Sequence, residues 1–295
     1  MGGGRDKRKK AKAKTGEISA SGAAKTERKT ERNEAKKERR EAAIEDYEGA
    51  SDEEEEEEEE DIEVLLKKAA LAGAEAEKQV TPCERPSPRR NFTLTPHPLR
   101  DGELILFGGE SFNGKNTKCF NELLLYRTKD NKWSQVSSPK PPPPRDSHQA
   151  ATFRDGFFVF GGMFTSPKTL EFYNYRDLWR LDLSTYEWDT LPIKGGPSAR
   201  CGHRMVLWKQ LLVVFGGYNE TSKGIKYYND LHAFELTENQ WHRVEVSGEW
   251  PSPRAGFQMV TVGDRALVYG GTYRKQADDE MAVYNDMFFF FQETN

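Results

Sequence analysis

Two histidines of this sequence recur at one position of a repeated pattern, and imidazoles are the first candidates for metal binding or acid–base chemistry. His148 and His203 each lie three residues after an arginine, and two further copies of the pattern carry Phe92 and Phe257 there. A position that accepts either His or Phe is typical of a packed ring and not of a metal ligand. The other histidines show no ligand spacing. We therefore expect no metal site at these residues.

Carboxylates and guanidinium groups also recur, and paired carboxylates can act as general acid and base. The acids are Glu122, Asp177, Asp230 and Asp286, and the arginines in step with the last three are Arg145, Arg200 and Arg254. One acid per repeat places the acids too far apart to cooperate in catalysis. The repeated set instead predicts the same polar contact between strands in every repeat.

The remaining reactive residues form no catalytic motif. The sequence contains no G-x-S-x-G, no P-loop and no H-E-x-x-H. Its three cysteines, Cys83, Cys119 and Cys201, are widely spaced and form no C-x-x-C pair. Neither a disulfide framework nor a zinc ribbon is therefore indicated. We predict no catalytic, cofactor-binding or metal-binding residues and a protein that is not an enzyme.

Four glycine pairs set the period of the pattern. They stand at 108–109, 161–162, 216–217 and 270–271, and their first glycines are 53, 55 and 54 residues apart. A near-constant step of this size indicates a repeat architecture. Each pair ends an apolar run, a turn with Pro and Arg precedes it, and a Trp follows in three copies, at Trp133, Trp188 and Trp241. Four short strands per unit, punctuated in this way, predict a propeller blade.

This pattern resembles the kelch motif, whose period is about 50 residues and whose fold is a β-propeller. The resemblance covers about residues 61–290, and specific segments are LRDGELILFGGESFNG, GGPSARCGHRMVLWKQLLVVFGGYNET and YYNDLHAFELTENQW. It implies an all-β propeller with blades at about 84–136, 137–192, 193–245 and 246–295, the last incomplete. Because relatives have six blades, we expect a truncated product of a longer protein. The alternative is a closed four-bladed ring, with a strand near Val80 supplying the missing strand.

By the same resemblance, the residue after each glycine pair points toward the loop face of the propeller. These predicted partner-binding residues are Glu110, Met163, Tyr218 and Thr272. These four residues differ among the repeats, while the residues around them stay the same. Such variation is expected of a recognition surface, and it is also expected of unconstrained loops. We expect an interaction scaffold that binds a protein or peptide and needs no cofactor. An enzyme that uses the propeller face is the less favoured alternative.

The chain begins with a charged leader over residues 1–60. Residues 1–40 hold 15 Lys and Arg against 6 Asp and Glu, and residues 52–61 are ten consecutive acids. With few large apolar side chains, the leader is predicted to be disordered, although a fluctuating or coiled-coil-like helix fits residues 25–48. The basic run solubilises the chain, acts as a nuclear localisation signal or contacts nucleic acid such as RNA. The last two readings give the alternative function of a nuclear or nucleolar RNA- or ribosome-assembly-associated factor.

Residues 61–78 predict a short amphipathic helix, because Ile62, Leu65, Leu66 and Ala69 lie on one stripe. Gly73 falls on the same stripe and weakens its end. The helix either packs on the flank of the propeller or binds a partner.

The proline run 141–144 is predicted to be a stiff connector between blades, with a polyproline ligand as the alternative. No apolar run reaches 18 residues and no signal peptide is recognisable. We expect a cytoplasmic or nuclear protein.

Overall fold

The chain divides into two compact units, residues 1–55 and 56–295. The computed structural model describes residues 61–74, 76–168, 171–221, 224–245, 248–275 and 280–290, all in the second unit. The predictions for residues 1–60 therefore lie outside the described residues. Within the described ranges, no helix is long and apolar enough to cross a membrane.

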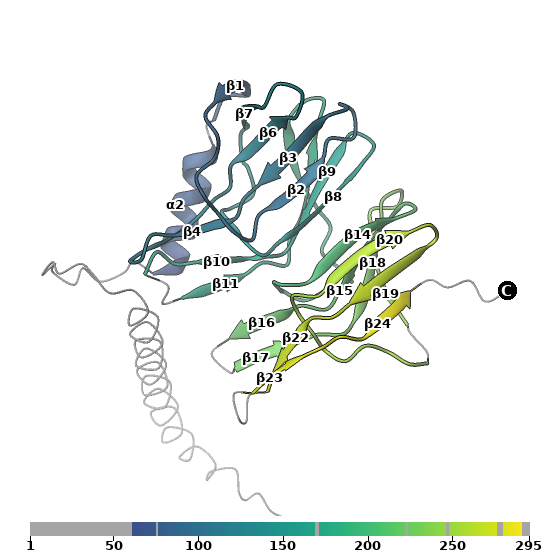
Figure 1. The fold of residues 1–295 in the computed structure, drawn as a ribbon. Coiled ribbons are helices and arrows are strands. Elements are labelled where there is room, and N and C mark those ends of the chain that lie inside the picture. The colour runs from purple at the N-terminus through teal and green to yellow at the C-terminus, as the bar shows by residue number, and fades with distance from the viewer. Residues whose placement is uncertain are drawn as a thin grey trace, which may run out of the picture. The chain divides into compact units, whose positions relative to one another are not determined.

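Four antiparallel sheets correspond to the four predicted blades (Figure 1). The first contains β2 (Thr93–Pro96), β3 (Glu103–Phe107), β6 (Leu123–Arg127) and β7 (Lys132–Ser137), and the second contains β8 (Gln149–Phe153), β9 (Gly156–Phe160), β12 (Leu178–Asp182) and β13 (Glu187–Leu191). The third contains β14 (Arg204–Trp208), β15 (Leu211–Phe215), β18 (Leu231–Glu235) and β19 (Gln240–Val244), and the fourth contains β20 (Gln258–Val262), β21 (Arg265–Tyr269) and β24 (Met287–Phe290). Successive first strands are neighbours in space, β2 beside β8, β8 beside β14 and β14 beside β20. The fold is all-β, with its sheets stacked as propeller blades.

Strand β1 (Gln79–Cys83) extends the first blade. It pairs with β7, and Val80 lies opposite Val136. The alternative, in which a strand near Val80 supplies the missing strand of the fourth blade, is therefore wrong. The outer edge of β7 offers unpaired backbone groups to β1, and an edge strand tolerates Pro82, which cannot donate a ladder hydrogen bond.

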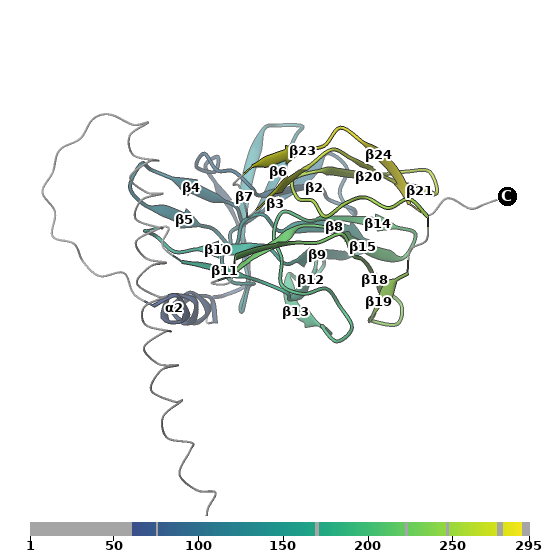
Figure 2. The same cartoon turned by 90° about the horizontal axis from the view of Figure 1, so that it is seen from below.

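Each repeat also carries a small second sheet that the sequence did not predict. The pairs are β4 (Glu110–Phe112) with β5 (Thr117–Cys119), β10 (Met163–Thr165) with β11 (Phe172–Asn174), β16 (Tyr218–Thr221) with β17 (Gly224–Tyr227), and β22 (Thr272–Arg274) with β23 (Met281–Val283). Each begins directly after a glycine pair. Strands of three or four residues are too short to show a hydrophobic period. These strand pairs extend from the main sheets toward the same side (Figures 1 and 2).

The glycine pairs are required where one blade meets the next. Gly161 and Gly162 have φ values of 62° and 91°, in the region that favours glycine. A Cβ at Gly161 would lie 2.8 Å from the carbonyl oxygen of Arg200, and a Cβ at Gly162 would lie 2.6 Å from that of Asp146. The Gly162 amide donates to the Arg200 carbonyl at 2.9 Å, so the close approach joins the second blade to the third.

The recurring arginines make the predicted contact between strands. Arg145 is fully buried and donates to both carboxylate oxygens of Asp177, at 2.8 and 2.9 Å. It also donates to the Gly161 carbonyl at 3.0 Å, and its guanidinium lies over the Tyr175 ring. The equivalent ion pairs of the other repeats are Arg200 with Asp230, Arg254 with Asp286 and Arg89 with Glu122. Each arginine thus ties the turn that opens a repeat to the glycine pair and a later strand of that repeat.

The histidines pack as predicted. The His148 ring meets the Phe107 ring of the preceding blade edge-on, with centroids 5.4 Å apart. Phe257 fills the equivalent position against Phe215 at 5.2 Å. His203 likewise packs on Phe160 at 5.2 Å. The alternation of His and Phe therefore reflects a ring contact between blades.

Two of the three recurring tryptophans cover the preceding blade. Trp188 packs on Phe107 at 5.4 Å, and Trp241 packs on Phe160 at the same distance. Trp133 differs, because it is half-buried and packs at a tilt on Tyr126 of its own sheet. The prediction of a core position between blades thus holds for Trp188 and Trp241 only.

Helix α2 spans Ile62–Ala74 and is shorter than the predicted range. It has no fully buried residue, and its end lies against the proline run. The Lys140 amide donates to the Gly73 carbonyl at 2.9 Å, and a Cβ at Gly73 would lie 2.7 Å from the Pro141 ring. These contacts support packing on the flank of the first blade.

The proline run is half-buried, and its carbonyl groups are used inside the fold. Pro142 accepts from Asn121 at 3.3 Å, and Pro144 accepts from the Tyr175 hydroxyl at 3.0 Å. Arg145 donates to the Pro143 carbonyl at 3.1 Å. These bonds support the connector and leave the run poorly placed to act as a polyproline ligand.

Candidate functional site

A row of backbone hydrogen bonds links successive repeats in the turns that precede the first strands β2, β8, β14 and β20. Two residues after each turn arginine stand Asn91, Ser147, Gly202 and Gly256, all with positive φ between 51° and 66°. Ser147 donates to the Asn91 carbonyl at 2.9 Å, Gly202 to Ser147 at 3.2 Å, and Gly256 to Gly202 at 3.0 Å. Asn is among the residues that tolerate this conformation best after Gly. This row of hydrogen bonds fixes the spacing of the four first strands.

A cavity of about 490 Å³ opens beside this row and is lined from all four repeats. Besides the row itself, the lining includes Arg204, Tyr218, Glu220, Tyr227, Thr272 and Arg274. The centroids of the Tyr218 and Tyr227 rings lie 5.6 Å apart, and the Tyr227 ring also packs on Tyr273 of the next repeat, with centroids 4.9 Å apart. Arg204 donates to the His203 carbonyl at 3.0 Å, which fixes the side chain at the wall. The cavity thus combines aromatic faces with two guanidinium groups.

The four residues predicted to bind a partner all open a small second sheet. Each pairs with the residue that follows a turn arginine: Glu110 with Arg90, Met163 with Asp146, Tyr218 with Cys201, and Thr272 with Ala255. Tyr218 and Thr272 line the cavity. Met163 does not, and Glu110 is 5% exposed and lies in a separate polar cluster. The structure therefore brings together two of the four.

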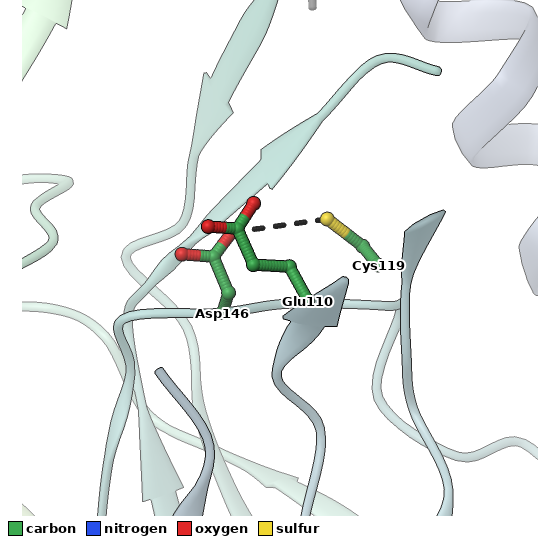
Figure 3. Close-up of side chains that lie close together, drawn as sticks. All are labelled: Glu110, Cys119 and Asp146. Atoms are coloured by element: carbon green, nitrogen blue, oxygen red, sulfur yellow. Dashed lines mark hydrogen bonds between the residues drawn. The ribbon is translucent and has the colours of Figure 1, made fainter. Parts of the chain in front are cut away.

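That polar cluster consists of Glu110, Cys119 and Asp146 (Figure 3). Glu110 comes from β4, Cys119 from β5, and Asp146 from the turn that leads into β8 of the second blade. One carboxylate oxygen of each acid and the Cys119 Sγ all lie within 4.8 Å of one another. The Cys119 Sγ donates to Asp146 Oδ2 at 3.7 Å. Among the described residues, this is the group whose donor atoms could hold a metal ion.

The charges in the cluster are unevenly compensated. Glu110 accepts from Arg90 Nε at 2.8 Å and from Asn91 Nδ2 at 3.2 Å. Asp146 is fully buried, accepts from the Ser147 hydroxyl at 2.8 Å, and forms no salt bridge within the described ranges. Burial, and then the charge of Glu110, raise the pKa of Asp146 to about 7. Burial, and then the charge of Asp146, raise the pKa of the Cys119 thiol well above its usual value.

Sequence reasoning missed this cluster because residues 110, 119 and 146 have no ligand spacing. A signal was present in the repeats: Glu110 follows a glycine pair and Asp146 follows a turn arginine, two positions that recur in step. The basic run of the leader lies outside the described residues, so its roles in nuclear localisation and RNA contact stay predictions.

The stacked antiparallel sheets, the glycine pairs and the buried Arg–Asp pairs define a kelch-repeat β-propeller protein. The KLHDC2/KLHL20/DRC7 Kelch-repeats domain matches residues 53–294, and the chain belongs to this family.

Similar proteins carry the repeats inside much longer chains. The chain is 28% identical over 188 residues to "Acyl-CoA-binding domain-containing protein 4" of Arabidopsis thaliana, which is 63% of this chain and 26% of that protein. It is 33% identical over 150 residues to "Dynein alpha chain, flagellar outer arm" of Chlamydomonas reinhardtii, which is 50% of this chain and 3% of that protein. The solved "Structure of YjhT" has a TM-score of 0.54 at 18% identity, with 70% of each chain covered, and shows the similarity of fold.

Proposed function

We propose that this protein is a non-enzymatic scaffold, and that the cavity beside the row of backbone hydrogen bonds binds a peptide segment of a partner protein. The observation that supports this is the cavity itself, because four repeats supply its wall and the row of backbone hydrogen bonds holds that wall rigid. A rigid framework that presents loop and hairpin side chains is how repeat propellers bind partners.

The lining favours a peptide over a small metabolite. Tyrosine and arginine are enriched where proteins bind one another, because their flat faces bury area at low entropic cost and their polar ends keep hydrogen bonds. Tyr218 and Tyr227 supply such faces, and Arg204 and Arg274 offer donors to backbone carbonyls or acidic side chains. We expect the bound peptide to place an aromatic or aliphatic side chain on the tyrosines.

Selection from a displayed peptide library against the full chain tests this proposal. We expect enriched peptides to bind the wild-type protein and to bind Tyr218→Ala at least about 10-fold more weakly, a loss typical of an interface hot spot. Arg243→Ala is the matched control, because Arg243 is exposed on the outer strand β19, away from the cavity lining. Equal binding by all three proteins, or no enrichment at all, would contradict the proposal.

Within the family, we propose that the chain resembles kelch domain-containing protein 4 and its fungal relatives. The support is the segment LRDGELILFGGESFNG together with the basic and acidic leader. We also propose a cytoplasmic or nuclear location, to be checked by microscopy of a fluorescent fusion with and without residues 1–40.

A further inference from the structure

We propose that Glu110, Cys119 and Asp146 form a zinc site that fastens the β4–β5 hairpin of the first blade to the start of the second. The three side chains come from two blades and converge on one point (Figure 3). One ligand atom from each of the three lies within 4.8 Å of the other two.

The spacing of one ligand pair is close to that of tetrahedral zinc. With Zn–S near about 2.3 Å and Zn–O near about 2.0 Å, the sulfur and oxygen of a tetrahedral site are separated by about 3.5 Å. Cys119 Sγ and Asp146 Oδ2 are 3.7 Å apart. Three protein ligands would leave the fourth position to water, as in open zinc sites.

The donor set selects among metals. Mg²⁺ and Ca²⁺ prefer oxygen ligands only, whereas a thiolate favours Zn²⁺. On binding, the Cys119 thiol loses its proton to solvent and forms the metal–sulfur bond, and any proton on Asp146 is released in the same way. A divalent cation would also supply the positive charge that the fully buried Asp146 lacks, since this residue forms no salt bridge in the described part of the chain.

The equivalent positions at the other junctions carry no such set. Where the first junction has Glu110, Cys119 and Asp146, the second has Met163, Asn174 and Cys201, and the third has Tyr218, Tyr227 and Ala255. A repeat that needed buried acids for its own packing would place them at every junction. Their confinement to one of the three junctions described here therefore points to a local role.

A neighbouring residue adds a second observation. Both backbone groups of Thr165 contact the Cys119 sulfur, with the amide at 3.4 Å and the carbonyl at 3.7 Å. The Thr165 hydroxyl is buried and has no hydrogen-bond partner within the described ranges. A buried hydroxyl without a partner is costly unless a ligand or a water satisfies it. A zinc-bound water is a group of the right chemistry.

Zinc titration of the full chain, followed by calorimetry and thermal unfolding, tests the proposal. We expect one stoichiometric site in the wild-type protein and a higher Tm when Zn²⁺ is present. Cys119→Ser and Asp146→Asn should each weaken this site by about 10-fold or more, because each removes one ligand. Co²⁺ in place of Zn²⁺ should produce a thiolate-to-cobalt charge-transfer band that Cys119→Ser abolishes.

Two controls separate this site from weak binding elsewhere. Cys83→Ser removes a thiol outside the cluster and should leave the titration unchanged. We expect the ten acids at residues 52–61 to bind divalent cations weakly, so the titration includes an excess of Mg²⁺ to compete for them. Zinc binding that Cys119→Ser leaves unaltered, or no zinc binding in the presence of Mg²⁺, would overturn the proposal. If Cys119→Ser does not fold, the cobalt band of the wild-type protein decides alone.

Discussion

At the scale of single residues, the glycine pairs combine two constraints that can be separated. Gly161 has φ of 62°, and a Cβ there would lie 2.8 Å from the Arg200 carbonyl oxygen. Gly263, in the turn between β20 and β21, has the same φ of 62° and nothing within 4 Å of the equivalent Cβ. One position therefore requires both an unusual backbone angle and close approach, while the other requires the angle only.

We predict that Gly161→Ala lowers the free energy of unfolding by about 3 kcal/mol, of which about 1 kcal/mol reflects the backbone angle and the rest the clash. Gly263→Ala should cost only about 1 kcal/mol. Urea denaturation followed by tryptophan fluorescence measures both. Equal losses in the two variants would mean that the contact between the Gly161 backbone and the third blade contributes nothing.

At the scale of secondary-structure elements, the histidine rings buried between neighbouring blades make the stability of the fold depend on pH. His148 is fully buried, and burial together with the charge of Arg145 lowers its pKa to about 3. The pKa of His203 is lowered for the same reasons, by burial and by Arg200. Because the unfolded chain binds a proton near pH 6.5 and the folded chain does not, stability is present above that pH. It is lost as the pH falls from about 6.5 toward about 3.

We predict that His148→Phe reduces the loss of stability between pH 7.5 and pH 5 by about 2 kcal/mol relative to the wild-type protein. Phe257 occupies the same position in the fourth blade, so the ring itself is compatible with the fold. The reverse change, Phe257→His, should increase the acid sensitivity by a similar amount. Denaturant midpoints at the two pH values measure both effects. Identical pH dependence in all three proteins would show that these rings do not control it.

At the scale of the whole described unit, the fourth blade exposes an apolar face whose counterpart in the second blade is buried. Tyr269 stands at the position of Phe160, yet it is 48% exposed whereas Phe160 is 0% exposed. On the same face, Val260 lies opposite Leu267, and Leu267 lies opposite Phe289. The other face, with Phe290 stacked on Trp250, packs on the third blade. Along β24, Phe289 on this face is exposed and Phe290 on the other face is buried.

We predict that this face causes the chain to self-associate, because a contiguous apolar patch on a sheet is favourable to bury. The double variant Val260→Glu, Phe289→Glu should remain monomeric at concentrations where the wild-type protein associates. Val283→Glu, at an exposed residue of the small β22–β23 sheet, is the control and should behave as wild type. Sedimentation velocity at several concentrations measures the difference. A wild-type protein that stays monomeric throughout would contradict the prediction.

The sequence by itself determined the repeat and its framework. The step between glycine pairs, the apolar runs that end at Gly108, Gly161 and their equivalents, and the arginine–acid partners such as Arg145 and Asp177 are periodic. A periodic pattern survives in one dimension because each blade obeys the same local rules of strand, turn and burial. The tertiary structure decided which distant positions meet: Glu110 and Cys119 with Asp146 across two blades, and Val80 with Val136 within the first. It also left Tyr269 exposed where Phe160 is buried. These contacts depend on how the twisted sheets are arranged in space. The sequence spacing of residues that lie far apart in the chain does not reveal that arrangement.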